Sequence, residues 1–399
     1  MKHAWTGPAC AGLFTLVLAA CGGSSATSSS APMTISQPTT LNLYPNQSSN
    51  NAGRLTIMAT AIGSLPVNLP VKFDTGSAGV TLYAPSVFPS SMVTNSGFIF
   101  PAGESSMTYN GITVTTTQGT REYGSTSEVK YNGNVGYATL TLGDSQGTLT
   151  TQVMPIFFYY SYTDAADNTI EAAAGDEAGW LGVASTYGTV VVDGVTDPAG
   201  GLQVCSQQTQ GSCEVVSALK YLSYGSSVNA GFVLAPATLQ SCDITVAGSC
   251  SPAPILTVGL TSALESGFST TALTCPPSGN IGEVGIAGYP VCGKNISGVS
   301  IAASGASVGS ITNTALFDSG TRDMEIAPPA GSTFPSTVVV GSTVLVTTPS
   351  GFTYSFTAGT GNLTTVVNEN SGSISIIGVG YFTSHSFFVD FSSSIEGWK

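Results

Sequence analysis

One short pattern occurs twice in this chain, once in each half, and it limits the possible folds and chemistries more than any other feature. The first copy is Phe73-Asp74-Thr75-Gly76-Ser77 and the second is Phe317-Asp318-Ser319-Gly320-Thr321, each at the end of a strand-like segment. A single copy would be an ordinary turn, in which Asp bonds its own backbone and Gly takes a positive φ. Two copies in separate halves fit two loops that meet at one site.

Two facing carboxyl groups are the chemistry that such loops would support. Two carboxylates about 4 Å apart repel by roughly 4 kcal/mol at an effective dielectric constant near 20, or about three pK units. One group therefore keeps its proton while the other is ionised. The ionised group can take a proton from water while the neutral one hydrogen-bonds a scissile carbonyl group. Asp74 and Asp318 are the predicted catalytic residues.

The small residues of both copies have predicted supporting roles. We expect the hydroxyl group three positions after each Asp to donate to that Asp, and the hydroxyl group directly after it to tie the loops together. Glycine lets the two backbones approach. The predicted supporting residues are Thr75, Gly76, Ser77, Ser319, Gly320 and Thr321.

On these residues the chain resembles the pepsin-like aspartic proteases, whose two lobes each contribute one such loop. The resemblance extends from about Arg54 to Lys399. It implies a mostly β, bilobal fold, in which two antiparallel, barrel-like lobes enclose a cleft with the Asp pair at its floor. It also implies an aspartic-type endopeptidase that acts on peptide or protein substrates without a cofactor.

Three other stretches carry the resemblance. Glu122-Tyr123-Gly124-Ser125 and the strand-like residues 136–143 resemble the family's flap, so Tyr123 is the predicted flap tyrosine. Tyr109 lies in an equally good hairpin turn and is the alternative. Residues 179–184 resemble the strand that passes behind the first catalytic loop, and residues 376–398 follow the family's C-terminal pattern.

The chain departs from the family after the second copy of the pattern. Arg322-Asp323 stands where a small hydroxyl residue is usual. The guanidinium of Arg322 could lower the pKa of Asp318, or it could point outward and have no effect on it.

The N-terminal 53 residues are expected to lie outside the folded body. Residues 1–21 have a basic start and a short apolar core that ends in Leu18-Ala19-Ala20-Cys21. This resembles a bacterial lipoprotein signal and implies a lipid on the thiol of Cys21, whereas plain secretion is the alternative. Gly22 favours an outer-membrane anchor in the cell envelope. Residues 22–53, rich in Ser, Thr, Asn, Gln and Pro, predict a disordered tether.

Length and charge limit the number of folded units and the kinds of partner that we expect for the rest of the chain. A chain of 399 residues exceeds the usual limit of one hydrophobic core, so we expect an N-terminal lobe at 54–238 and a C-terminal lobe at 239–399. With 9 basic and 22 acidic residues, the formal charge is −13, which makes nucleic acid an unsuitable partner. We expect a monomer.

The cysteines predict disulfides rather than a metal site. Cys205 with Cys213, Cys242 with Cys250, and Cys275 with Cys292 are neighbouring pairs among the fifteen pairings that six cysteines allow. After removal of the signal, one histidine remains, His385, and no Cys-x-x-Cys is present. Zinc therefore has few ligands, and a site based on Ser, His and Asp has a single candidate histidine.

Three functions remain open from the sequence. The first is a lipid-anchored aspartic endopeptidase. The second is a pepsin-like protein that has lost catalysis and binds peptides or envelope partners. The third is an unrelated β-rich surface adhesin, in which the two Asp residues would lie far apart.

The lipid anchor gives the first testable prediction. Cys21→Ala should move the protein from the membrane fraction to the soluble fraction of the envelope, because the variant has no thiol for the lipid. Fractionation followed by mass spectrometry of the N-terminal peptide measures this. An N-terminus without lipid in the wild type would contradict the anchor.

Overall fold

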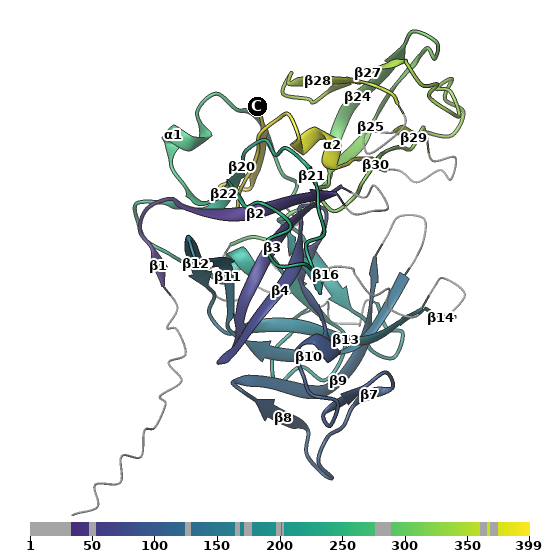
Figure 1. Ribbon diagram of the computed structural model, residues 1–399. Helices are drawn as coiled ribbons and strands as arrows, with labels where there is room; N and C mark the ends of the chain where they lie inside the picture. The colour runs from purple at the N-terminus through teal and green to yellow at the C-terminus, as the bar shows by residue number, and fades with distance from the viewer. Residues whose placement is uncertain are drawn as a thin grey trace, which may run out of the picture.

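The computed structural model describes residues 33–47, 53–123, 129–163, 168–170, 178–196, 201, 203–275, 289–359, 365–367 and 374–399. The predicted signal segment and its Cys21 lie outside these residues. The described chain consists mainly of β-strands, as predicted. Figure 1 shows a lower group of strands from the N-terminal part of the chain and an upper group from the C-terminal part, with strand β2 (Thr39–Gln47) between them.

The N-terminal strands form a strongly curved sheet. Paired neighbours follow one another in the order β8-β9-β10-β13-β5-β15-β4-β3-β2. A hairpin of β11 (Leu140–Asp144) and β12 (Gly147–Thr150) pairs with β3. The other bounds are β3 (Gly53–Ile62), β4 (Leu65–Asp74), β5 (Ala78–Tyr83), β8 (Ser106–Tyr109), β9 (Ile112–Tyr123), β10 (Val129–Ala138), β13 (Met154–Thr163) and β15 (Gly179–Val183).

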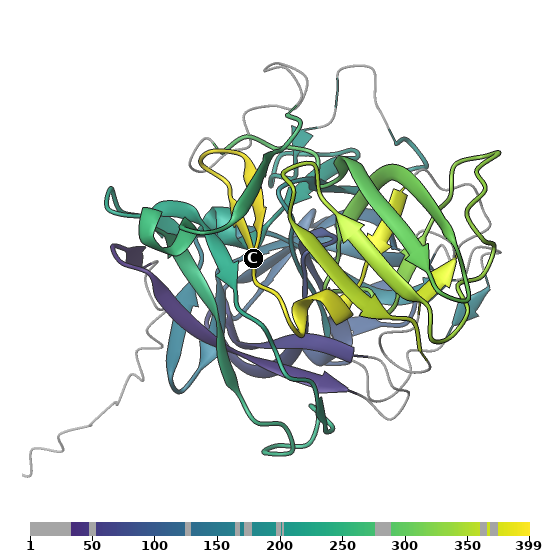
Figure 2. The ribbon, with the colours of Figure 1, turned by 90° about the horizontal axis from the view of Figure 1, so that it is seen from above.

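The C-terminal strands form a second sheet, drawn in green and yellow in Figure 2. Its order is β28-β27-β24-β25-β30-β26-β29. Strand β27 shows why the sequence folds this way, because Val344 and Val346 are buried while Leu345 between them is exposed, the alternation of a sheet with one covered face. The bounds are β24 (Ile296–Ser304), β25 (Gly309–Phe317), β26 (Met324–Ile326), β27 (Thr343–Thr347), β28 (Thr353–Thr357), β29 (Thr365–Val367) and β30 (Ile374–Ile377).

A third, antiparallel sheet joins the two ends of the chain. Its order is β2-β22-β20-β31-β32-β23. The bounds are β20 (Asn229–Leu234), β22 (Ala253–Leu260), β23 (Ser269–Ala272), β31 (Phe387–Asp390) and β32 (Ile395–Trp398). The predicted lobe boundary after residue 238 falls between β20 and β22, which pair with each other, so both predicted lobes contribute to this shared sheet.

The prediction of a disordered tether at residues 22–53 is wrong for Thr39–Gln47. Residues 39–43 pair with β22, and residues 44–47 pair with β3. Leu41 and Leu43 are 1% and 0% exposed. Asn42 and Tyr44 both donate hydrogen bonds to the carboxylate of Asp144, at 2.9 and 2.8 Å. The polar composition suggested a disordered segment, but the few apolar residues of this strand are buried in the core and its polar residues form hydrogen bonds.

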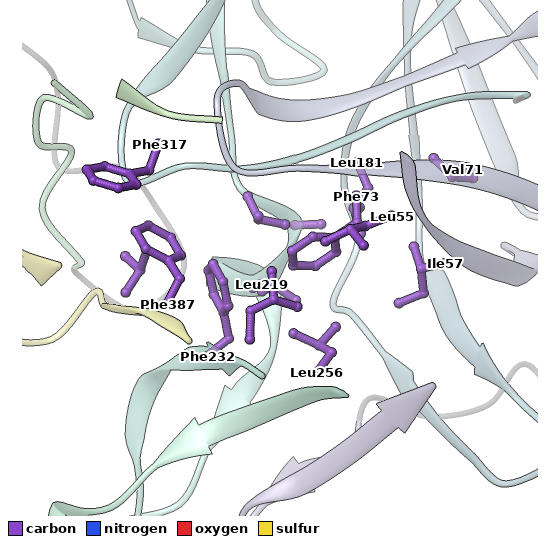
Figure 3. Packing of buried hydrophobic residues seen from close by; sticks show 14 of the residues in the cluster. Leu55, Ile57, Val71, Phe73, Leu181, Leu219, Phe232, Leu256, Phe317 and Phe387 are labelled. Atoms are coloured by element: carbon purple, nitrogen blue, oxygen red, sulfur yellow. The ribbon is translucent and has the colours of Figure 1, made fainter. Parts of the chain in front are cut away.

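The hydrophobic core connects the two Asp-containing loops. The ring of Phe73 lies 5.6 Å from that of Phe232 on β20, edge to face. Phe232 lies 6.3 Å from Phe387 on β31, and Phe387 lies 6.3 Å from Phe317. Figure 3 shows these four rings in a row among buried Leu, Ile and Val side chains. The residue before each Asp is thus anchored on the shared sheet.

The three predicted disulfides are confirmed. Cys205 is bonded to Cys213, Cys242 to Cys250, and Cys275 to Cys292. Among the residues that the structure describes, no helix is both long enough and apolar enough to cross a bilayer.

The buried position of β2 generates a stability prediction. Leu43→Ala should lower the free energy of unfolding by about 2–5 kcal/mol, because it leaves a cavity in the core. Thr40→Ala, on an exposed position of the same strand, should change it by about 0.5 kcal/mol or less. Urea unfolding measures both, and equal small effects would contradict the assignment of β2 to the core.

Candidate active site

Each Asp of the repeated pattern lies in a loop between two strands, and a third strand passes behind that loop. Asp74 ends β4, and β15 pairs with both β4 and β5 on either side of the loop. Asp318 follows β25, and β30 pairs with both β25 and β26. The prediction that residues 179–184 pass behind the first loop is confirmed.

Matching glycines allow these strands to come close to the loops. A Cβ atom on Gly182 would overlap the backbone of Ser77 and Ala78, and one on Gly378 would overlap the backbone of Thr321 and Asp323. A backbone hydrogen bond close to each glycine then ties the strand to its loop. The amide of Ala184 donates to Ser77 O at 2.9 Å, and the amide of Val379 donates to Thr321 O at 2.8 Å. The two halves therefore support their loops in the same way.

The hydrogen bonds within the two loops also match. Asp74 accepts from the amide of Gly76 at 2.8 Å and from the hydroxyl of Ser77 at 2.6 Å. Asp318 accepts from the amide of Gly320 at 2.6 Å and from the hydroxyl of Thr321 at 2.7 Å. Each carboxyl group thus has both oxygens bonded to its own loop, which fixes its orientation.

Crossed hydrogen bonds tie one loop to the other. The hydroxyl of Thr75 donates to Phe317 O at 2.8 Å and accepts from the amide of Ser319 at 2.9 Å. In return, the hydroxyl of Ser319 donates to Phe73 O at 2.8 Å and accepts from the amide of Thr75 at 3.1 Å. Both hydroxyl groups are buried, so these bonds are protected from water.

The glycines of the pattern bring each loop against the opposite carboxyl group. A Cβ atom on Gly76 would overlap the carboxyl group of Asp318, and one on Gly320 would overlap that of Asp74. The structure thus brings together the eight residues that the sequence singled out in the two loops.

Asp74 and Asp318 lie within hydrogen-bonding reach of each other, and both are buried. The pKa of Asp318 is raised to about 7, first by burial and then by the charge of Asp74 and the hydrogen bond to it. The hydroxyl of Thr321 and the charge of Lys294 act in the opposite direction. The pair therefore retains one proton up to near-neutral pH.

The pair lies in a cleft of about 660 Å³. One wall of the cleft includes the aromatic side chains of Tyr123, Tyr131 and Trp180. The rings of Tyr123 and Trp180 stack at 5.3 Å, and Tyr131 meets Trp180 edge to face at 4.9 Å. A substrate in this cleft would contact both the aromatic wall and the two carboxyl groups.

Tyr123, the predicted flap tyrosine, ends β9 and lines this cleft. Its hydroxyl group is bonded to that of Thr81 at 2.9 Å, and burial raises its pKa. The next two residues of the predicted flap, Gly124 and Ser125, lie outside the described residues. The alternative, Tyr109, packs against Phe88 at 5.9 Å and does not line the cleft.

Arg322 does not act on the pair. Its guanidinium donates two hydrogen bonds to the carboxylate of Asp323, at 2.8 and 2.6 Å, and the Arg322 side chain is 46% exposed. Of the two possibilities that the sequence left open, the structure shows the outward orientation. Within the described chain, no group of three or more His, Cys, Asp and Glu side chains is placed to hold a metal ion.

The sequence interpretation missed several basic residues in the cleft, among them Lys72, Arg121 and Lys294. Lys72 could have been found, because it lies two residues before Asp74 on the same strand and so shares its face. No local signal marks Lys294, which is 218 residues from its hydrogen-bond partner Gly76.

A solved structure of similar fold supports the architecture. The aspartic proteinase from Irpex lacteus matches with a TM-score of 0.50 and 14% sequence identity, over 91% of this chain and 97% of that chain. The chain has a pepsin-like fold. No protein-family model matches the sequence. No curated protein sequence matches it either.

The raised pKa of Asp318 generates a prediction for the pH dependence of stability. An Asp in the unfolded chain titrates near pH 3.9, whereas the pKa of Asp318 in the folded protein is about 7. Between these pH values the folded protein holds a proton that the unfolded chain has released, so the free energy of unfolding should fall as pH rises.

Asp318→Asn removes this proton, so its stability relative to the wild type should increase by about 2–4 kcal/mol between pH 4 and pH 7.5. Urea unfolding of both proteins across this range measures the difference. Parallel curves would show that Asp318 titrates normally.

Proposed function

We propose that the protein is an aspartic endopeptidase whose catalytic residues are Asp74 and Asp318. The observation that carries this proposal is the pair of buried carboxyl groups within hydrogen-bonding reach of each other at a cleft, each held by matching donors. The adhesin alternative required these residues to be far apart. The fold, which is similar to that of an aspartic proteinase from Irpex lacteus, supports the same function.

The reaction follows from one proton shared by two carboxyl groups. A water molecule bound between them gives a proton to the ionised carboxylate while its oxygen attacks the scissile carbonyl carbon. The protonated carboxyl group donates its proton to the carbonyl oxygen, and a tetrahedral diol forms. As the diol collapses and the C–N bond breaks, the amine takes a proton from the protonated carboxyl group, and one diol hydroxyl group gives its proton to the other carboxylate. The products are a carboxylic acid and an amine, and the pair again holds a single proton.

The buried bonds of Thr75 and Ser319 would act as positioning contacts in this reaction. They hold both loops at the separation at which one water molecule can reach both carboxyl groups. Tyr123 would form part of the wall over the substrate, next to Trp180.

We also propose that the enzyme acts in a bacterial cell envelope, attached through a lipid on Cys21. The support for this is the sequence Leu18-Ala19-Ala20-Cys21, together with three disulfides, which are typical of exported proteins.

Replacement of either Asp tests the catalytic proposal. Asp74→Asn and Asp318→Asn should each lower peptide cleavage at least a thousandfold, because Asn can neither take nor supply the proton. Asp243→Asn, in an exposed loop, is the matched control and should retain full activity. Cleavage of an unstructured protein substrate, followed by mass spectrometry, measures all four proteins.

The pH profile gives a second readout in the same experiment. Cleavage by the wild type should fall as the pH rises past about 7, where the pair loses its shared proton. An intact fold that binds peptides without cleaving them at any pH would instead establish the catalytically inactive alternative.

A further inference from the structure

Basic residues are concentrated in the cleft of an otherwise acidic protein. The chain has 9 Lys and Arg residues and a formal charge of −13. Four of the nine line the cleft: Arg54, Lys72, Arg121 and Lys294. The cleft also contains the Asp pair, which shares a proton, and the acidic residues Glu122 and Glu325. Among the described residues that line the cleft, the local charge is therefore positive relative to the rest of the molecule.

Lys294 reaches the Asp pair from the C-terminal side. Its ammonium group donates to the backbone carbonyl of Gly76, and its charge lowers the pKa of Asp318. The segment that carries it is held in place, because Cys292 is bonded to Cys275 and the amide of Cys292 donates to Ser185 O at 3.3 Å. The position of Lys294 is thus built into the fold.

Lys72 reaches the loop of Asp318 from the N-terminal side. It lies on β4, and its ammonium group is 3.5 Å from the backbone carbonyl of Gly320 and 5.3 Å from the centre of the Trp180 ring. Lys294 contacts the loop of Asp74, whereas Lys72 contacts the loop of Asp318. Each lysine therefore contacts one of the two loops that hold the Asp pair.

Two other polar groups in the cleft could each take an additional partner. Arg121 is 3% exposed and bonds Thr81 and the backbone of Ala78, but within the described chain it forms no ion pair with a carboxylate. The side-chain oxygen of Asn295, next to Lys294, is buried without a hydrogen-bond partner among the described residues. A buried cation without a counter-ion is costly, and an anionic ligand would offset that cost.

We propose that the cleft selects peptides with acidic side chains next to the scissile bond, and that Lys72 and Lys294 are the residues that determine this specificity. This inference rests on the proposed endopeptidase function. A Glu or Asp side chain on either side of the bond would meet one of the two ammonium groups, and the aromatic wall beside Lys72 would cover its methylene groups. A Lys or Arg side chain would be repelled at both places.

The conditions of the reaction suit such substrates. A Glu side chain of a peptide is ionised above about pH 4.3. The Asp pair holds its shared proton up to near-neutral pH. Between about pH 5 and pH 6.5, both the charge on the substrate and the proton on the enzyme are therefore present.

A matched set of peptides tests the proposal at pH 5.5. The peptides differ only in the residue before or after the scissile bond, which is Glu, Gln or Lys. The wild type should cleave the Glu peptides with a kcat/KM about tenfold above that of the Gln peptides, as expected for one charge-assisted contact, and the Lys peptides should be slowest. The preference for Glu should decrease as salt is raised from 0.05 to 0.5 M.

Lys72→Met and Lys294→Met should each bring the ratio of kcat/KM for the Glu peptide to kcat/KM for the Gln peptide close to one. Each variant should do so for only one of the two positions, before or after the scissile bond. This ratio is measured on a single variant, so it cancels any change in the amount of active enzyme. Lys399→Met is the matched control, because Lys399 lies outside the cleft and donates to Ser266 O. It should keep the wild-type ratio on both sides.

The outcomes separate this inference from the function on which it rests. Cleavage of none of the peptides or of an unstructured protein would overturn the endopeptidase proposal. Cleavage with no preference for Glu, or with a preference that both lysine variants retain, would leave that proposal intact and overturn the specificity.

Discussion

Two acidic groups can be held side by side only if other interactions offset their repulsion, and much of this structure serves that purpose. Two charged carboxylates at about 4 Å repel by roughly 4 kcal/mol at an effective dielectric constant near 20. The shared proton removes most of this repulsion, and the four crossed hydrogen bonds of Thr75 and Ser319, at about 1 kcal/mol each, resist separation of the loops. The row of Phe rings from Phe73 to Phe317 then fixes both loops on the shared sheet.

Local patterns were enough to predict the centre of the site. Each Asp loop is a short segment, and its Asp, hydroxyl and glycine residues indicate their roles by their order alone. The disulfides are also local, because they join cysteines 8, 8 and 17 residues apart. Strand β2 was missed because its place depends on β3 and β22, the latter more than 200 residues away. A polar composition could not show that Leu41 and Leu43 enter a core built by the rest of the chain.

Lys294 was missed for the same reason, since its effect depends on what the fold brings near it. Lys294 opposes the burial and the charge that raise the pKa of Asp318. Its charge therefore favours the ionised form of the pair, whereas burial favours the protonated form. Arg322, which is only four residues from Asp318 in sequence, has its charge paired with Asp323. Proximity along the chain is thus no guide to which cation acts on the pair.

The near-symmetry of the two loops has a further consequence for how the two carboxyl groups divide their roles. Each accepts one amide and one hydroxyl hydrogen bond from its own loop, at distances that differ by 0.2 Å or less. Hydrogen bonds so similar cannot decide which group keeps the proton. That choice must come from outside the loops, and Lys294 contributes an asymmetric field there, because its charge lowers the pKa of Asp318. Lys294, one of the two residues proposed to select the substrate, therefore also biases the proton within the pair.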